Sequence, residues 1–205
     1  SPTVITIYSS NGITGLGNEA ITLSGNTSVA NTNSVAALTT GVVTATITEG
    51  DMSTLAGLTE TGNAYTVTIT DSSVASSALN TLDGKTTVAV NAAAVTTLTG
   101  LAADANTAYA SSGISGLGNE AVTLSDTTLA VATLNTLNGN TTGVVNAATV
   151  ATLTGAASAM NTAYTAGGNS EISGLGNEAI TLDDTTLAVA TLNTLNGNTT
   201  GVVNA

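Results

Sequence analysis

The chain has 205 residues, with thirteen acidic residues against a single basic one, Lys85, so its formal net charge is −12. It contains no His or Cys, which excludes zinc and haem sites, disulfides, and catalysis by a cysteine nucleophile or an imidazole base. One basic residue cannot neutralise a phosphate backbone, so no nucleic-acid partner is expected. The sequence contains no complete P-loop motif, and no apolar run reaches the roughly 18 residues of a membrane span.

The first twelve residues are β-prone and stand outside the repeated part of the sequence. Thr3–Tyr8 is rich in β-branched residues, which favour strands. We therefore expect a strand here, and one use for it is to pair with the sheet of a neighbouring molecule. The segment has no basic n-region and does not resemble a signal peptide.

Residues 13–205 contain internal repeats. The motif Gly-Leu-Gly-Asn-Glu-Ala occurs at 15–20, 116–121 and 174–179. Residues 121–147 and 179–205 align without gaps and differ only at Val122/Ile180 and Ser125/Asp183. This divides the repeat region into units at 20–120 and 121–178 and a partial unit at 179–205. Because such self-similarity is typical of stacked architectures, a solenoid is expected.

A shorter period underlies these units and begins with a strand. Thr44–Thr48 and Tyr65–Thr70 alternate Thr with apolar residues, which is the pattern of a half-buried strand. Ala121–Leu124 is a shorter form of the same pattern. Such stretches recur about every 22 residues, or every 34–37 where the Gly-Leu-Gly-Asn-Glu-Ala motif intervenes.

The second part of each period is expected to be helical. Two apolar stripes with +3 and +4 spacing would each bury one helix face: Val95, Leu98, Ala102, Ala105 and Tyr109, and Val150, Leu153, Ala157, Met160 and Tyr164. Gly100 and Gly155 lie inside the stripes, so each stripe is expected to break into two short helices.

Polar residues and glycines mark the ends of two further expected helices. Asp71 and Asp126 introduce N-caps before helices that begin at Val74 and Leu129, and Gly84 and Gly139 supply C-terminal stops.

The fold class that follows is an α/β solenoid, with a parallel sheet and one short strand and one or two short helices per rung of about 22 residues. The alternative is an all-β helix, because Thr and Asn are poor helix formers.

The repeated unit at 116–147 and 174–205 resembles repeats in giant Thr/Ala/Gly-rich cell-surface proteins of marine cyanobacteria. Asp71–Gly84 fits the same pattern. The resemblance implies an exported, acidic, cysteine-free structural repeat of a surface layer, fibre or motility-associated coat.

Calcium is the only cofactor that the motifs suggest. The Gly-Leu-Gly-Asn-Glu-Ala motif is similar to the calcium-binding nonapeptide of RTX proteins, although Glu replaces Asp and the copies are far apart. Neighbouring rungs would have to complete the oxygen ligands of a calcium ion. The candidate ligands are Glu19, Glu120, Glu178, Asp126, Asp183 and Asp184. The alternative is a Gly-rich turn with Glu at its surface.

Other candidate sites have simpler explanations. Asp183 and Asp184 form the only adjacent acid pair, and they are better explained as a helix N-cap than as glycosidase carboxylates. Lys85 is expected in a solvated loop. Thr66, Thr68 and Thr70 on one strand face, like Thr44, Thr46 and Thr48, resemble an ice-binding array, but other rungs lack the pattern.

These observations predict a structural repeat protein, not an enzyme, that forms an extracellular fibre or cell-surface coat by end-to-end stacking. The expected partner is a further copy of itself, with no small-molecule substrate. The alternatives are a calcium-dependent adhesin or binding module and an ice-binding protein.

Overall fold

The computed structural model describes residues 2–205, in which short strands and helices alternate and every strand pair is parallel. The chain divides into two compact units. Unit 1 comprises Ser1–Val74, Ala78–Val95 and Ser111–Gly116, and unit 2 comprises Ala75–Ser77, Thr96–Ala110 and Leu117–Ala205. The protein is therefore an α/β protein with a repeating pattern, as predicted, and the all-β alternative is wrong.

Unit 1 contains three helices and five strands in the part that the structure describes. The helices are α1 (Pro2–Tyr8), α2 (Val29–Ala36) and α3 (Met52–Leu55). The strands are β1 (Ile21–Thr27), β2 (Val43–Ile47), β3 (Ala64–Thr66), β5 (Val90–Asn91) and β7 (Ile114–Ser115). Strand β4 (Ser73–Ala75) and helix α4 (Ser76–Asp83) hold residues of both units.

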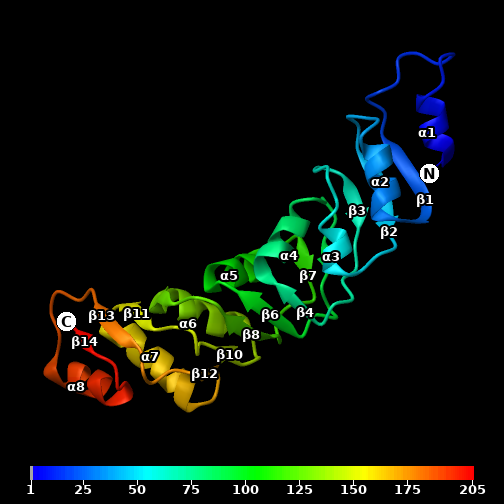
Figure 1. The fold of residues 1–205 in the computed structure, drawn as a ribbon. Helices are drawn as coiled ribbons and strands as arrows, with labels where there is room; N and C mark the ends of the chain where they lie inside the picture. Colours follow the sequence, from blue (N-terminus) through cyan, green and yellow to red (C-terminus); the bar gives the residue numbers. More distant parts are fainter. Residues whose placement is uncertain (1) are drawn as a thin grey trace. The chain divides into compact units, whose positions relative to one another are not determined.

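Unit 2 contains the most regular part of the repeat. Its helices are α5 (Ala102–Ala110), α6 (Val131–Asn140), α7 (Ala157–Gly168) and α8 (Val189–Asn198). Its strands are β6 (Thr97–Gly100), β8 (Ala121–Leu124), β9 (Thr128–Ala130), β10 (Val145–Asn146), β11 (Thr152–Gly155), β12 (Ile172–Ser173), β13 (Ala179–Leu182) and β14 (Val203–Asn204). Helix α6 contacts α5 and α7, and α7 contacts α8, so the four helices follow one another beside the strands (Figure 1).

In each sheet the strands lie side by side in the order in which they occur along the chain. The offset along the sequence between paired residues varies, being shorter for Thr44 with Ala64 than for Thr152 with Ala179. Val122 pairs with Val145, and Ile180 pairs with Val203 at an identical offset. We call the chain segment from one strand of a sheet to the next strand of that sheet a layer.

The interior of the layers consists of alternating strand residues and one face of each helix. Val43, Ala45 and Ile47 of β2 are buried, and the threonines between them are exposed. Tyr65, Val67 and Ile69 are buried in the same way, with Thr66, Thr68 and Thr70 outside, which confirms the predicted facing of this stretch. β-Branched residues and Thr suit such half-buried strands, and small residues let the layers approach closely.

The N-terminal segment differs from the prediction, because Pro2–Tyr8 is helix α1 and not a strand. The helix brings the Tyr8 hydroxyl to 2.7 Å from the Glu19 carboxylate. A tertiary hydrogen bond and packing against α2 thus override the β-propensity of Val4, Ile5 and Ile7.

The two long apolar stripes also differ from the prediction, because their first halves are strands. Leu98 lies on β6 and Leu153 on β11, and the helices begin only at Ala102 and Ala157. Gly100 and Gly155 end these strands with φ of 123° and 128°, a conformation that an α-helix cannot contain and that Gly adopts most easily.

The expected helix ends are correct in one case and shifted in the others. Helix α4 ends at Asp83, directly before Gly84, as predicted. Helix α6 runs through Gly139 to Asn140, and α4 and α6 begin two residues later than expected, because Val74 and Leu129 belong to strands.

Candidate functional site

The Gly-Leu-Gly-Asn-Glu-Ala motif folds back on its own backbone. The Glu120 carboxylate accepts the N–H groups of Gly118 at 2.8 Å and Asn119 at 3.1 Å. Glu19 accepts the Gly17 N–H at 2.7 Å, and Glu178 accepts the Gly176 N–H at 2.9 Å. The motif is therefore a tight turn that holds its own carboxylate.

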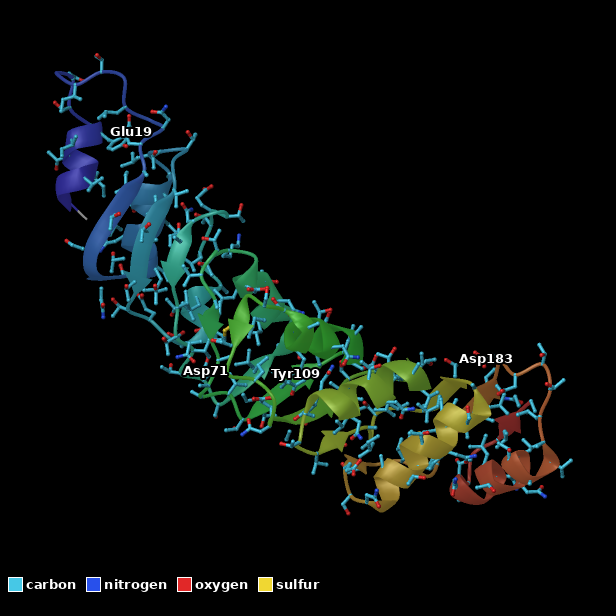
Figure 2. The ribbon with its side chains drawn as sticks, turned by 180° about the vertical axis from the view of Figure 1, so that it is seen from behind. Glu19, Asp71, Tyr109 and Asp183 are labelled. Atoms are coloured by element: carbon cyan, nitrogen blue, oxygen red, sulfur yellow. The ribbon has the colours of Figure 1, made fainter. Side chains whose placement is uncertain are left out.

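A tyrosine donates a further hydrogen bond to each of these carboxylates. Tyr109, near the end of α5, reaches Glu120 at 2.9 Å, and Tyr164 on α7 reaches Glu178 at 3.0 Å. Tyr8 at the end of α1 does the same to Glu19, which Figure 2 shows in the loop beside that helix. The Glu carboxylate thereby fixes the end of a helix to the turn that follows it.

A Thr-Thr-Gly segment from the next layer closes the arrangement. The Thr141 hydroxyl donates to the Glu120 carbonyl at 2.7 Å, and the Thr142 N–H donates to the Gly118 carbonyl at 3.0 Å. A Cβ on Gly143 would lie 2.3 Å from the Glu120 carbonyl oxygen, so only Gly fits there. We call this set of contacts the Glu–Thr clamp.

The clamp occurs three times with the same partners. The first joins Tyr8, Glu19, Thr39 and Gly41, and the third joins Tyr164, Glu178, Thr199 and Gly201. Thr39 and Thr199 donate to the Glu19 and Glu178 carbonyls at 2.6 and 2.8 Å. Each clamp thus connects two consecutive layers through side-chain and backbone hydrogen bonds.

The surroundings of the clamps lower the pKa of the Glu19 carboxyl and raise the pKa of the tyrosine hydroxyls. The Gly17 N–H, followed by the Tyr8 hydroxyl, holds the pKa of Glu19 below its ordinary value. Burial, as the main cause, raises the pKa of the Tyr109 and Tyr164 hydroxyls well above the ordinary 10.0. Glu120 is fully buried, and its Oε1 has no hydrogen-bond partner in the structure.

A second group of acids caps helices of the preceding layer. Asp126 Oδ2 accepts the N–H of Ala102, the first residue of α5, at 2.8 Å, and Asp184 Oδ2 accepts that of Ala157 on α7 at 2.7 Å. Asp71 accepts the Met52 N–H of α3 at 2.7 Å. These carboxylates satisfy free N–H groups at the helix start and lie at the positive end of the helix dipole.

Asparagine side chains of one layer donate hydrogen bonds to backbone carbonyls of the following layer. Asn106 Nδ2 donates to the Thr133 carbonyl at 3.0 Å, and Asn135 Nδ2 donates to the Ala159 carbonyl at 2.9 Å. Asn33 makes the corresponding bond to Gly57 at 2.7 Å. Both units therefore use amide side chains to connect one layer to the next.

The structure does not bring the six calcium candidates together as one set of ligands. Glu19, Glu120 and Glu178 lie in different clamps, and Asp126 and Asp184 cap different helices, whereas Asp183 is exposed after β13 (Figure 2). Within residues 2–205, no group of three or more acids could hold a metal ion. Calcium binding stays a prediction, and five of the six candidates have a hydrogen-bonding partner in the fold. Lys85 donates to the Thr59 carbonyl at 3.0 Å.

The tyrosines and the Thr-Thr-Gly segments were absent from the candidates drawn from the sequence. The tyrosines can be found by extending the alignment of the first two motifs toward the N-terminus. Without a gap, this alignment pairs Gly12 with Gly113 and Tyr8 with Tyr109. The similarity to the second motif therefore extends back to Tyr8. The Thr-Thr-Gly segment recurs at 39–41, 141–143 and 199–201, each time at nearly the same distance along the chain after a Glu of the motif.

Comparison with family models, curated proteins and solved structures finds no match for this chain. No helix in the described part of the chain is long and apolar enough to cross a membrane.

Proposed function

We propose that the chain is a structural repeat protein whose layers continue as an α/β solenoid and whose copies stack end to end into an extracellular fibre or surface coat. The observation that carries the proposal is that the Glu–Thr clamp occurs three times. In each clamp a threonine hydroxyl of one layer donates to the Glu carbonyl of the layer before it. An architecture in which each layer depends only on its neighbours can be extended without a change of design.

The use of the polar residues supports this function. The carboxylates of the Gly-rich turns and of the helix caps accept hydrogen bonds from backbone N–H groups or tyrosine hydroxyls within the fold. The cap carboxylates accept these bonds from the preceding layer. The chain lacks the His and Cys residues on which many active sites depend. Using a carboxylate for a hydrogen bond between layers is what we expect of a scaffold.

The composition supports an extracellular location. The net charge of −12 favours solubility, and the absence of Cys makes stability independent of the redox state of the surroundings. Small apolar residues and threonines form the layers without a large aromatic core.

Electron microscopy of the purified chain at high concentration tests the proposal. We expect fibres or sheets with a repeat along the stacking direction. Discrete particles of one copy at all concentrations, supported by a constant sedimentation coefficient, would contradict assembly.

One observation favours a second candidate, a calcium-dependent adhesin. The buried Glu120 Oε1 has no donor, and carboxylate oxygens are the ligands that calcium prefers. Calorimetric titration with calcium, with the Glu120→Gln variant as control, decides between the two: heat and a raised melting temperature lost in the variant would support it, and no heat in either would remove it.

A further inference from the structure

Helices α6 and α8 have the same sequence but different surroundings. Residues 131–140 and 189–198 both read Val-Ala-Thr-Leu-Asn-Thr-Leu-Asn-Gly-Asn. Strand β11 and helix α7 of the following layer contact α6. As a result Val131 is 1% exposed, whereas its counterpart Val189 is 74% exposed. The environment of α6 therefore shows what kind of surface fits α8.

The hydrogen bonds of α6 and α8, and those of the strands after them, differ in the same way as the exposure of the two valines. Asn135 of α6 donates to the Ala159 carbonyl of α7, but its counterpart Asn193 is exposed and has no such bond among the described residues. Strand β10 pairs with β8 on one side and with β12 on the other, whereas its counterpart β14 pairs with β13 alone in the described part of the sheet. One face of α8 and one edge of β14 thus lack the cover that the earlier copy has.

The first layer has the complementary surface. Aligned on Tyr8 and Tyr164, helix α1 corresponds to α7, and Ile7 corresponds to the fully buried Ala163. Ile13 corresponds to Ile172 of β12 and to Ile114 of β7. Ile13 is 47% exposed, whereas Ile172 and Ile114 are 2% and 9% exposed. Two apolar residues that would cover α8 and β14, Ile7 and Ile13, are therefore exposed.

We propose that the face of α8 and β14 in one copy binds the face of α1 and residues 13–14 in a second copy of this chain. In this complex α1 takes the place on α8 that α7 has on α6, and Val203 and Asn204 pair with Ile13 and Thr14 as Val145 and Asn146 pair with Ile172 and Ser173. The inference rests on the proposed end-to-end stacking and specifies its partner surfaces and its register.

The register follows from hydrogen bonds that exist inside unit 2. The Val145 N–H donates to the Glu171 carbonyl and the Ala147 N–H to the Ser173 carbonyl. Their counterparts are the Val203 N–H to the Gly12 carbonyl and the Ala205 N–H to the Thr14 carbonyl of the second copy. Both groups of residues are exposed or half-buried in the single chain.

Disulfide formation between single-cysteine variants tests this register, because the chain contains no Cys of its own. Neighbouring strands lie about 4.8 Å apart, within the Cα separation that a disulfide accepts. A mixture of the Asn204→Cys and Thr14→Cys variants is expected to give a covalent dimer under mild oxidation. The Asn146→Cys/Ser173→Cys double variant is the intrachain positive control, and Asn204→Cys mixed with Thr44→Cys, an exposed residue of β2, is the matched negative control.

The Val189→Asp substitution gives a second measurement. Val189 is exposed in the single chain, so the variant is expected to fold, as circular dichroism would show, and to reduce dimer formation about tenfold. Val144→Asp, at a valine that is exposed within an inner layer, should leave dimer formation unchanged.

The outcomes separate this inference from the proposed function. Assemblies seen by electron microscopy without the Asn204–Thr14 disulfide, or unaffected by Val189→Asp, would overturn these surfaces and leave stacking intact. If the wild-type chain stays monomeric, both fail, and the α8 face must fit another occupant, such as a further layer of a longer chain.

Discussion

The Glu of each clamp shows how a charged residue serves packing at the scale of one side chain. Burying a carboxylate is costly unless hydrogen bonds replace its water. Glu120 obtains two backbone N–H groups and a tyrosine hydroxyl, all on Oε2. Its own carbonyl accepts from Thr141. The residue thus links a helix end, a turn and the next layer.

Gly143 permits the closest approach between layers, so a methyl group there should be damaging. The Gly143→Ala variant is expected to lose about 2 kcal/mol of unfolding free energy, because its Cβ would overlap the Glu120 carbonyl. Urea unfolding measures the loss. The control is Gly139→Ala in α6, where a Cβ meets nothing within 4 Å and Ala favours the helix. Equal stability of the two variants would contradict the clamp.

The tyrosines give the fold a sensitivity to alkaline pH. Burial raises the pKa of Tyr109 and Tyr164 above the ordinary 10.0, so the unfolded chain ionises first as pH rises. Their stabilising contribution is complete below about pH 10 and is lost progressively above it.

Chemical denaturation at a series of alkaline pH values measures this loss. The Tyr109→Phe/Tyr164→Phe variant should be less stable at neutral pH, by about 2 kcal/mol per lost hydrogen bond to a carboxylate, and should lose less stability above pH 10. An identical alkaline slope in the two proteins would show that these hydroxyls ionise as in the unfolded chain.

At the scale of elements, helices α3, α5 and α7 each receive a capping carboxylate from the following layer. Helix α7 begins at Ala157 without a side-chain cap from Ala156, the residue before it. Asp184 of the following layer supplies the missing acceptor. The stability of one helix is therefore coupled to the presence of the next layer.

The adjacent acids Asp183 and Asp184 allow a matched test of this coupling. The Asp184→Ala variant should lose about 1 kcal/mol of unfolding free energy, the usual effect of removing an N-cap acceptor. Asp183→Ala, at an exposed position, should change it by less than about 0.5 kcal/mol. Thermal unfolding of both variants measures the difference, and a larger effect at Asp183 would contradict the capping role.

Some strands were predictable from the sequence, but β4, β6, β9 and β11 and the starts of the helices were not. Alternation of Thr with apolar residues identified β2 and the stretch around β3, because one face of each is buried. The apolar stripe from Val150 to Tyr164 has helical spacing, but its first part is strand β11 and only its second part is helix α7. Buried residues of a strand and of the helix after it can face the same interior and so imitate the spacing of a single helix. The φ of Gly155 separates the two elements, and backbone conformation is not visible in an apolar pattern.

The candidate site was predictable only in part. The Gly-rich turn around Glu19, Glu120 and Glu178 was expected, but with Glu at its surface, whereas Glu120 and Glu178 are buried. The partners of these carboxylates are a tyrosine from the helix before the turn, and the carbonyls of the same residues accept from a threonine of the layer after it. Asp71 and Asp126 were correctly expected to be caps, but of the wrong helix. To predict a cap that comes from a neighbouring layer, one must know how the two layers are aligned. The sequence of a single segment does not give this alignment.

At the scale of the whole molecule, the long sequence repeats and the layers have different periods. The motif begins at Gly15, Gly116 and Gly174, so the first interval between copies is much longer than the second. The offset between paired strands is shorter than either interval in both units. The longer interval therefore contains more layers of the same kind. This regularity, and not any single pocket, is the basis of the proposed scaffold function.

The most direct test of the layered architecture is the distance between spin labels at exposed positions of successive strands in unit 2. Thr123 pairs with Asn146, and Asn146 pairs with Ser173, so labels at 123 and 146 lie one strand apart and labels at 123 and 173 lie two strands apart. With about 4.8 Å between strands, electron paramagnetic resonance should show strong dipolar broadening for the first pair and weaker but clear broadening for the second. Absence of broadening in the 123/146 pair, in a variant that is folded by circular dichroism, would contradict the stacking of layers.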